Sequence, residues 1–148
     1  MTADDRLAKL LPATSLAEAL AFYDSLPAVL PEEMLGSWKG EELATGHLYD
    51  GLLGTSGWWG KRFQSVDAVD PLLFERNGKL FAGNPGLMPL GLIERFPALA
   101  KARPSAALFR FCSPLLRTRK PRARLRPLTY RGVTSAAMIY DQLPIADC

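Results

Sequence analysis

Near the amino terminus, apolar residues recur at the three- and four-residue spacing of a helix. Leu7 and Leu10 follow an acidic start, and Pro12 ends the pattern because a helix interior does not tolerate proline. A second helix is predicted after Ser15, where Glu18 completes a capping box. Two short helices are therefore expected before the first strand.

From Trp38 onward the pattern changes to short strands separated by glycine-rich turns. Trp38–Leu43 and Gly57–Phe63 are the first two predicted strands. Pro71–Glu75 and Lys79–Ala82 flank Asn77-Gly78. Asn-Gly between two apolar runs is the strongest short signal for a β-hairpin, so these two runs are predicted to pair.

A long connection follows the hairpin. Asn84–Pro104 is punctuated by proline and glycine, and one helix is expected in it, around Leu90–Phe96 or Pro97–Lys101. Ala106–Phe111 is apolar and runs into a turn at Pro114. A connection of this length is uncommon and is often functional.

The last segment reads as a second hairpin. Arg122, Arg124 and Arg126 alternate with apolar residues, which places the three arginines on one face of a strand. Arg131-Gly132 is the predicted turn, and Val133–Tyr140 is the returning strand. The returning strand carries small side chains, which leave volume that something else must fill.

These elements predict a mainly β protein with leading helices, an α+β fold. We divide the chain into a helical lead over residues 1–35, a strand region over 36–83, and a connection with the carboxy-terminal hairpin over 84–148, together one domain. No apolar run approaches the length of a membrane span, and the first residues lack an export signal. The protein is therefore expected in the cytoplasm.

The stretch from Gly36 to Gly40 places one large aromatic residue, Trp38, between two glycines. A buried tryptophan removes about 200 Å² of side chain from water, so Trp38 is expected to anchor the core as a plug or floor. The flanking glycines let another segment or a ligand approach the backbone closely. A packed core tryptophan without a ligand remains the simpler alternative.

Several motifs, in order, resemble those of a known bacterial family, the GXWXG proteins. The motifs are Gly36–Gly40, Thr45–His47, Asp50–Leu53, Gly57–Phe63 and Pro71–Phe74, and Tyr130–Gly132 with Ala137–Ile145 is similar to the domain of unknown function that usually follows. The resemblance implies a lipocalin-like antiparallel β-barrel in which the Gly-x-Trp strand closes one end. It implies no established reaction.

The chain departs from this family pattern at its carboxy terminus. Related proteins typically continue through further strands, whereas this sequence stops at Ala146-Asp147-Cys148. The stop would leave the barrel incomplete, with an open edge through which a partner chain can pair to form an oligomer.

An inward set of strand aromatics would line a pocket for a small apolar, lipid-like ligand, although such residues can equally fill a solid interior. Lys61 and Arg62 flank this pocket strand, and either can meet a carboxylate or phosphate head group at the mouth, although a place on the solvated face is the simpler interpretation for both. The candidate ligand-binding residues are Trp38, His47, Trp58, Trp59, Lys61, Arg62, Phe63, Phe74, Met138 and Tyr140. The leading hypothesis is a binding protein for a fatty-acid-like ligand.

His47 is the single histidine of the chain. It is an alternative haem ligand, but a histidine with no cysteine or carboxylate cluster is weak support for a metal site, so no metal or cofactor is predicted. The serines stand in no nucleophile-elbow pattern and there is no phosphate-binding glycine loop. The sequence therefore assigns no catalytic residue.

Basic residues concentrate in one segment that contains no acid. Seven of the eighteen basic residues are Arg117, Arg119, Lys120, Arg122, Arg124, Arg126 and Arg131. An anionic membrane surface is one candidate partner for this segment. Nucleic acid is disfavoured because only Tyr130 interleaves with the charges as a stacking platform. The simplest interpretation is a solvated outer strand face that also deters edge pairing.

Overall fold

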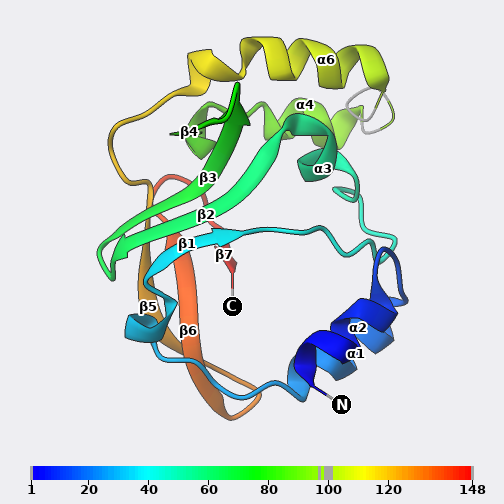
Figure 1. Ribbon diagram of the computed structural model, residues 1–148, viewed down its shortest axis with the longest axis vertical. Coiled ribbons are helices and arrows are strands. Elements are labelled where there is room, and N and C mark those ends of the chain that lie inside the picture. Colours follow the sequence, from blue (N-terminus) through cyan, green and yellow to red (C-terminus); the bar gives the residue numbers. More distant parts are fainter. Residues whose placement is uncertain (1, 97, 99–101, 148) are drawn as a thin grey trace.

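The computed structural model describes residues 2–96, 98 and 102–147 (Figure 1). The alternative helix predicted over Pro97–Lys101 lies outside the described residues, except for Ala98. The chain folds into a curled antiparallel sheet with two groups of helices, one at each end of the view in Figure 1. This is the α+β fold predicted from the hydrophobic pattern.

The first group of helices precedes the sheet. Helix α1 (Ala3–Leu10) and helix α2 (Leu16–Asp24) each begin at a capping box, in which the cap side chain accepts from a backbone N–H and an acidic side chain accepts in return. A 3₁₀ turn, η1 (Pro31–Met34), then leads into the sheet with proline at its first position. The second predicted helix start, Ser15 with Glu18, is confirmed.

The strands form one sheet in the order β1-β2-β3-β5-β6-β7, with β4 paired to β3 outside this path. All the pairings are antiparallel. The strands are β1 (Gly36–Lys39), β2 (Trp58–Ser65), β3 (Ala68–Arg76), β4 (Lys79–Ala82), β5 (Ala123–Tyr130), β6 (Val133–Tyr140) and β7 (Ala146–Asp147).

The sheet curls because one edge of β3 is divided between two strands, β4 and β5, while its other edge pairs with β2. Its carboxy-terminal half pairs with β4, while near its start only Val69 is paired in register with β5, opposite Ala123. The long hairpin of β5 and β6 can therefore turn away from β1 and β2, as Figure 1 shows. The result is a half-barrel whose path ends at β1 and β7, so the prediction of an incomplete barrel is confirmed.

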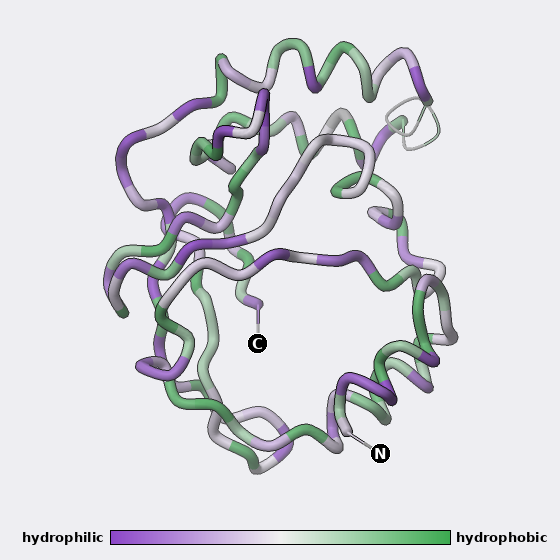
Figure 2. Tube along the Cα trace, viewed as in Figure 1, coloured by the Kyte–Doolittle hydropathy of each residue, from purple (hydrophilic) through white to green (hydrophobic). Residues whose placement is uncertain are grey.

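The second group of helices lies beyond the ends of β2, β3 and β4, at the top of Figure 1. Ala106–Phe111, predicted only as an apolar stretch, is part of the longest of these helices. The elements are α3 (Leu52–Ser56), η2 (Pro85–Leu87), α4 (Leu90–Arg95), α6 (Arg103–Cys112) and η3 (Ser113–Leu116). Figure 2 shows that the chain leaving this group toward β5 is mostly hydrophilic.

Both predicted hairpin turns are confirmed. Asn77 and Gly78 have positive φ angles of 52° and 71°, and Arg131 and Gly132 have φ angles of 48° and 81°. Two consecutive positive φ values match the right-handed twist of the flanking strands.

The first strand is shorter than predicted. It ends at Lys39 rather than continuing to Leu43, because Gly40 still donates its N–H to the carbonyl of Trp59 but the chain then leaves the sheet. Within the described residues, no helix is long and apolar enough to cross a membrane.

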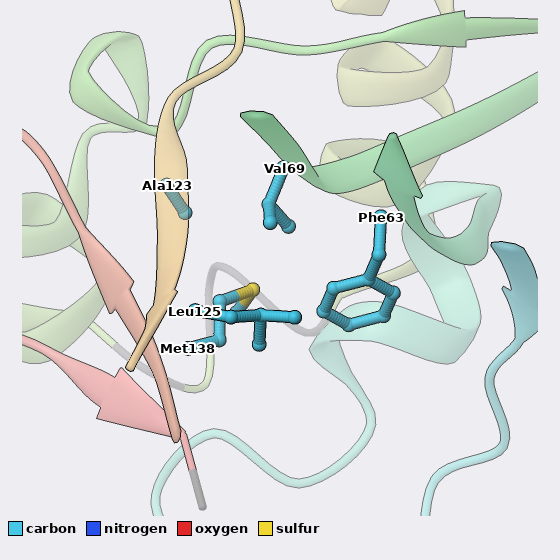
Figure 3. Close-up of a cluster of buried hydrophobic side chains, with 5 residues drawn as sticks. All are labelled: Phe63, Val69, Ala123, Leu125 and Met138. Atoms are coloured by element: carbon cyan, nitrogen blue, oxygen red, sulfur yellow. The ribbon is translucent and has the colours of Figure 1, made fainter. Parts of the chain in front are cut away.

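Buried side chains form two clusters. The first lies on the concave side of the half-barrel, where the side chains in Figure 3 converge from four strands: Phe63, Val69, Ala123, Leu125 and Met138. The second lies where the sheet meets the upper helices, and comprises Leu72, Phe74 and Phe81. Val69 and Leu73 of β3 have no exposed surface, which makes this strand the centre of the molecule.

Candidate functional site

A cavity of about 670 Å³ occupies the concave side of the half-barrel; we call it the concave cavity. The end of α2, the segment 26–29 and strands β1, β2, β5, β6 and β7 all contribute to its wall. Five candidate residues from the sequence line it: Trp38, Trp58, Lys61, Phe63 and Met138.

The floor of the concave cavity is the first buried cluster. Phe63, Leu125 and Met138 belong to this cluster and also line the cavity, and all three are at most 5% exposed. Ser135 and Ala136 of β6 add small side chains to the wall. The volume that the small residues of this strand were predicted to leave is therefore part of the cavity.

Trp38 is not the buried plug that the glycine-flanked motif predicted. Its side chain is 51% exposed and lines the rim of the concave cavity, where Nε1 donates to the carbonyl of Met34 at 2.8 Å. The prediction fails because β1 is an edge strand, so within the described chain only β2 pairs with it.

Trp58 takes the sealing position instead. A Cβ atom on Gly40 would lie 1.9 Å from the Trp58 ring, so the second glycine of the motif is needed for this indole to lie against the backbone. Trp58 also packs against the second buried cluster. Its Nε1 is buried and has no hydrogen-bond partner among the described residues.

A polar group stands at the β7 side of the concave cavity. Lys61 Nζ of β2 lies 2.5 Å from Asp147 Oδ2 of β7, so one ion pair spans the interior between strands that are not neighbours in the sheet. The Tyr140 hydroxyl donates to the same carboxylate oxygen at 3.3 Å. Burial, followed by the negative charge and hydrogen bonding of Asp147, raises the pKa of Tyr140. Tyr140 therefore remains a neutral donor at physiological pH.

A second ion pair closes the opposite rim. Arg131, in the turn between β5 and β6, donates to Asp24 at the end of α2, and both residues line the concave cavity. Beside this pair, the rings of Tyr23 and Tyr130 meet edge to face, 6.2 Å apart. These contacts fix α2 over the mouth of the half-barrel.

Arg62 and Trp59 do not line the concave cavity. Arg62 donates through Nε and Nη2 to Asp70 Oδ2, at 2.9 and 2.7 Å, and Gln64 donates to the same oxygen. Asp70 is 3% exposed, so these three donors satisfy a buried carboxylate. Alternation along β2 puts Arg62 on the face opposite Lys61 and Phe63.

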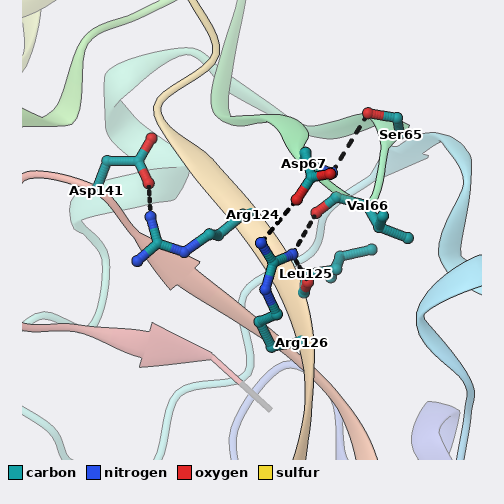
Figure 4. Close-up of polar contacts among 7 residues, drawn as sticks. All are labelled: Ser65, Val66, Asp67, Arg124, Leu125, Arg126 and Asp141. Atoms are coloured by element: carbon teal, nitrogen blue, oxygen red, sulfur yellow. Dashed lines mark hydrogen bonds and ion pairs between the residues drawn. The ribbon is translucent and has the colours of Figure 1, made fainter.

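Two of the three alternating arginines are held in ion pairs, as Figure 4 shows, whereas Arg122 precedes β5 and its Nε is buried without a hydrogen-bond partner among the described residues. Arg124 contacts Asp141 at 2.6 Å, and Arg126 contacts Asp67 at 2.7 Å. Ala123 and Leu125, which alternate with them, are buried, so the predicted two-faced strand is confirmed.

A second cavity, of about 710 Å³, lies between the upper helices and the sheet; we call it the helix-side cavity. Phe74 and Tyr140, both candidate residues, line it. Its charged lining residues are Glu42 and Asp50, and both hold the backbone of the loop before α3. Glu42 accepts from the N–H of Gly51 and Gly54, and Asp50 Oδ2 accepts from the N–H groups of residues 45–47.

His47 is exposed and lines neither cavity. Its Nδ1 accepts from the N–H of Tyr49 at 3.2 Å, and its ring contacts the Tyr49 ring at 5.3 Å. The backbone N–H of His47 donates to Asp50 Oδ2 at 2.8 Å. Across the described residues, no group of three or more His, Cys, Asp or Glu side chains could hold a metal ion.

Four charged residues that line the concave cavity were not candidates from the sequence: Asp24, Lys39, Arg131 and Asp147. Lys61 and Asp147 lie 86 positions apart, so no local spacing could have paired them. Strand alternation could have placed Leu125 inside, because it is flanked by arginines on both sides.

Two family models match the sequence. Residues 21–78 match the family described as GXWXG protein, and residues 121–148 match the Domain of unknown function (DUF4334). The chain is also similar to the crystal structure of a protein from Thermomonospora curvata, with a TM-score of 0.67 and 30% sequence identity over 99% of this chain and 79% of that one. A comparison with curated proteins gave no match.

Proposed function

This chain belongs to the GXWXG protein family, and we propose that it binds a small apolar ligand with an acidic head group, such as a fatty acid, in its concave cavity. The cavity volume of about 670 Å³ is in the range of small-molecule sites, about 300–1,000 Å³. Its wall combines a mainly apolar lining with a few polar groups, which is the usual composition of such sites.

The apolar part of the ligand would lie against the floor of the cavity. Phe63, Leu125 and Met138 present fixed side chains there, because they also belong to the buried core. Trp38 offers an aromatic surface at the rim that is already half-exposed and would lose water on binding. Burial of apolar ligand surface stabilises a complex by about 25 cal/mol per Å² before the costs of association are subtracted.

The charges of the wall favour an acidic head group. The concave cavity is lined by three basic residues, Lys39, Lys61 and Arg131, and by two acids, Asp24 and Asp147. The helix-side cavity has Glu42 and Asp50 as its charged lining residues and no basic one among the described residues. An anionic head would therefore be repelled from the helix-side cavity and attracted to the concave one.

Lys61 is the best placed partner for the head group, and this is the observation on which the proposal depends. Its side chain is 28% exposed and lines the cavity, and its ammonium contacts Asp147. An ammonium has three donors, so Lys61 can donate to Asp147 and to a ligand carboxylate at the same time. Charge-assisted hydrogen bonds of this kind contribute about 1.5–3 kcal/mol.

Tryptophan fluorescence titrated with laurate and with dodecanol tests the proposal. Both ligands should change the emission, and laurate should bind more tightly. In Lys61→Met the preference for the acid should fall about tenfold or more, while the alcohol is unaffected. Lys79→Met, which removes an exposed lysine in β4, is the matched control.

The source of the signal can be checked with two further variants. Trp38→Phe should remove much of the emission change because Trp38 lines the concave cavity, whereas Trp59→Phe should retain it. An absence of any spectral change at saturating laurate, or equal affinity of Lys61→Met for laurate, would rule the proposal out.

A further inference from the structure

A stripe of apolar residues on α6 and η3 is largely exposed to solvent. Leu108, Phe111 and Leu115 are 63%, 73% and 81% exposed. Their three- and seven-residue spacing puts them on one face of the helical segment. Phe109 points the other way, since its ring packs against Phe74 at 5.9 Å.

Apolar side chains of a helix that packs on a sheet usually face the core, so the exposure of these three is unusual. α6 already has an inward face, formed by residues such as Phe109 that pack on the sheet. Leu108 and Leu115 share the wall of the helix-side cavity with Phe109, and the described part of the chain leaves more than half of each stripe residue exposed. Contiguous exposed apolar surface on a soluble domain commonly marks an interaction site.

Basic residues lie on the same helix as the stripe and on the segment that follows it. Arg103 and Arg110 lie seven residues apart on α6, and Arg117, Arg119 and Lys120 follow η3; all five are exposed. None of the five forms an ion pair within the described residues. The sequence has no acidic residue between Glu94 and Asp141.

The hairpin arginines provide the contrast. Arg124, Arg126 and Arg131 are each paired with an aspartate. Their charges are thus largely neutralised locally, although they belong to the basic segment that the sequence made a candidate for an anionic surface. Arg117, Arg119 and Lys120 of the same segment form no ion pair among the described residues and follow the apolar stripe, where the chain is hydrophilic in Figure 2.

We propose that the stripe Leu108, Phe111 and Leu115, with its basic border, docks on an anionic lipid bilayer. Helices that lie in a membrane interface combine leucine and phenylalanine on one face with lysine and arginine beside them. The apolar side chains would enter the acyl boundary while the basic residues meet the lipid head groups. Charge complementarity selects an anionic bilayer over a neutral one.

The docking surface shares two residues with the wall of the helix-side cavity. Leu108 and Leu115 line this cavity as well as the stripe. Docking would therefore bring the rim of a cavity with a mostly apolar wall to the acyl boundary of the bilayer. The docking surface itself does not depend on ligand binding in the concave cavity.

Vesicle flotation tests the surface. The protein should float with vesicles of equimolar phosphatidylcholine and phosphatidylglycerol, and much less with phosphatidylcholine alone. The double variant Phe111→Gln with Leu115→Gln should bind about tenfold more weakly or worse. The matched control is Leu16→Gln with Leu30→Gln, which removes two leucines that are 59% and 60% exposed near the other end of the chain.

A second pair of variants tests the charges. Arg119→Gln with Lys120→Gln should weaken binding about 25-fold at low salt, since each basic residue near an anionic surface strengthens binding about fivefold. Arg124→Gln with Arg126→Gln, on the hairpin, should have a much smaller effect. Lys61→Met should float like the original protein, which separates this surface from the ligand site.

Three results would overturn the inference. The first is equal flotation with neutral and anionic vesicles. The second is a larger loss from the hairpin pair than from Arg119→Gln with Lys120→Gln. The third is absence of vesicle binding together with a lipid-free dimer, measured by light scattering, that Phe111→Gln with Leu115→Gln dissociates; the stripe would then be an interface between two copies of the chain.

Discussion

The two cavities of this protein are nearly equal in volume, about 670 and 710 Å³, but opposite in the charge of their walls. The concave cavity has more basic than acidic lining residues, and its Lys61–Asp147 pair is partly exposed. The helix-side cavity has two acids, both engaged with loop backbone. The similar volumes do not distinguish the two cavities as ligand sites, but the charges of their walls favour the concave cavity for an anionic ligand.

Trp58 forms part of the wall between these regions. It lines the concave cavity and packs on the Leu72, Phe74 and Phe81 cluster, of which Leu72 and Phe74 line the helix-side cavity. The Gly-x-Trp-x-Gly motif therefore contributes to this wall through its second glycine, which admits the Trp58 ring, more than through its own tryptophan.

The largest expected effect is a loss of folding stability when the contact between Gly40 and Trp58 in this wall is disturbed. Gly40→Ala places a methyl group inside the Trp58 ring, so we expect a loss of about 1–3 kcal/mol in the free energy of unfolding, measured with urea. Gly91→Ala in α4 is the control, since a Cβ there meets nothing within 4 Å and should leave stability unchanged or raise it. Equal stability of Gly40→Ala would show that the Trp58 ring is not held against this strand.

Filling each cavity in turn sharpens the comparison. Ala136→Trp, in the concave cavity, should lower laurate affinity about tenfold or more because the indole takes the ligand's volume. Ala106→Trp should leave that affinity nearly unchanged, since Ala106 lines the helix-side cavity. The reverse outcome in calorimetric titrations would move the ligand site to the helix side.

Removing the Asp147 carboxylate should raise the affinity for laurate, whereas Ala136→Trp lowers it. Asp147→Asn removes the carboxylate that shares Lys61 with the ligand, so laurate should bind a few times more tightly and dodecanol should be unaffected. Asp141→Asn removes a carboxylate that pairs with Arg124 outside the concave cavity and should change neither affinity. Weaker laurate binding in Asp147→Asn would mean that Asp147 positions the lysine rather than competing for it.

The smallest effect concerns alkaline pH. The raised pKa of Tyr140 means that the folded protein holds the phenol proton more tightly than the unfolded chain. This stabilisation is complete below the unfolded tyrosine pKa, about 10, and is lost as pH rises above it. Tyr140→Phe should therefore lose less stability than the original protein when urea unfolding is compared at pH 7 and above pH 10.

A control separates Tyr140 from general alkaline effects. Tyr130→Phe replaces a tyrosine that is 41% exposed and should keep the stability loss of the original protein above pH 10. An identical alkaline loss in Tyr140→Phe would show that this phenol is not protected by burial and Asp147.

Elements with a local signal were predictable from the sequence. The capping box at Ser15 and the turns at Asn77-Gly78 and Arg131-Gly132 depend on residues within a few positions of each other, and all three are confirmed. Helix α6 was missed because its apolar residues lie on two faces, one inward and one exposed, which blurs the helical period.

The candidate site was only partly predictable because its geometry is nonlocal. The sequence named both Lys61 and Arg62 as head-group partners, and only Lys61 lines the concave cavity, together with Phe63. The exposure of Trp38 depends on β1 being an edge strand, which no residue near Trp38 specifies. The Lys61–Asp147 contact depends on the curl of the whole sheet.

A crystal structure of the protein with laurate tests the central claim most directly. We predict density for the chain along Phe63, Leu125 and Met138, with the carboxylate within hydrogen-bond distance of Lys61 Nζ. Density for laurate in the helix-side cavity, or a carboxylate turned away from Lys61 toward solvent, would contradict the account.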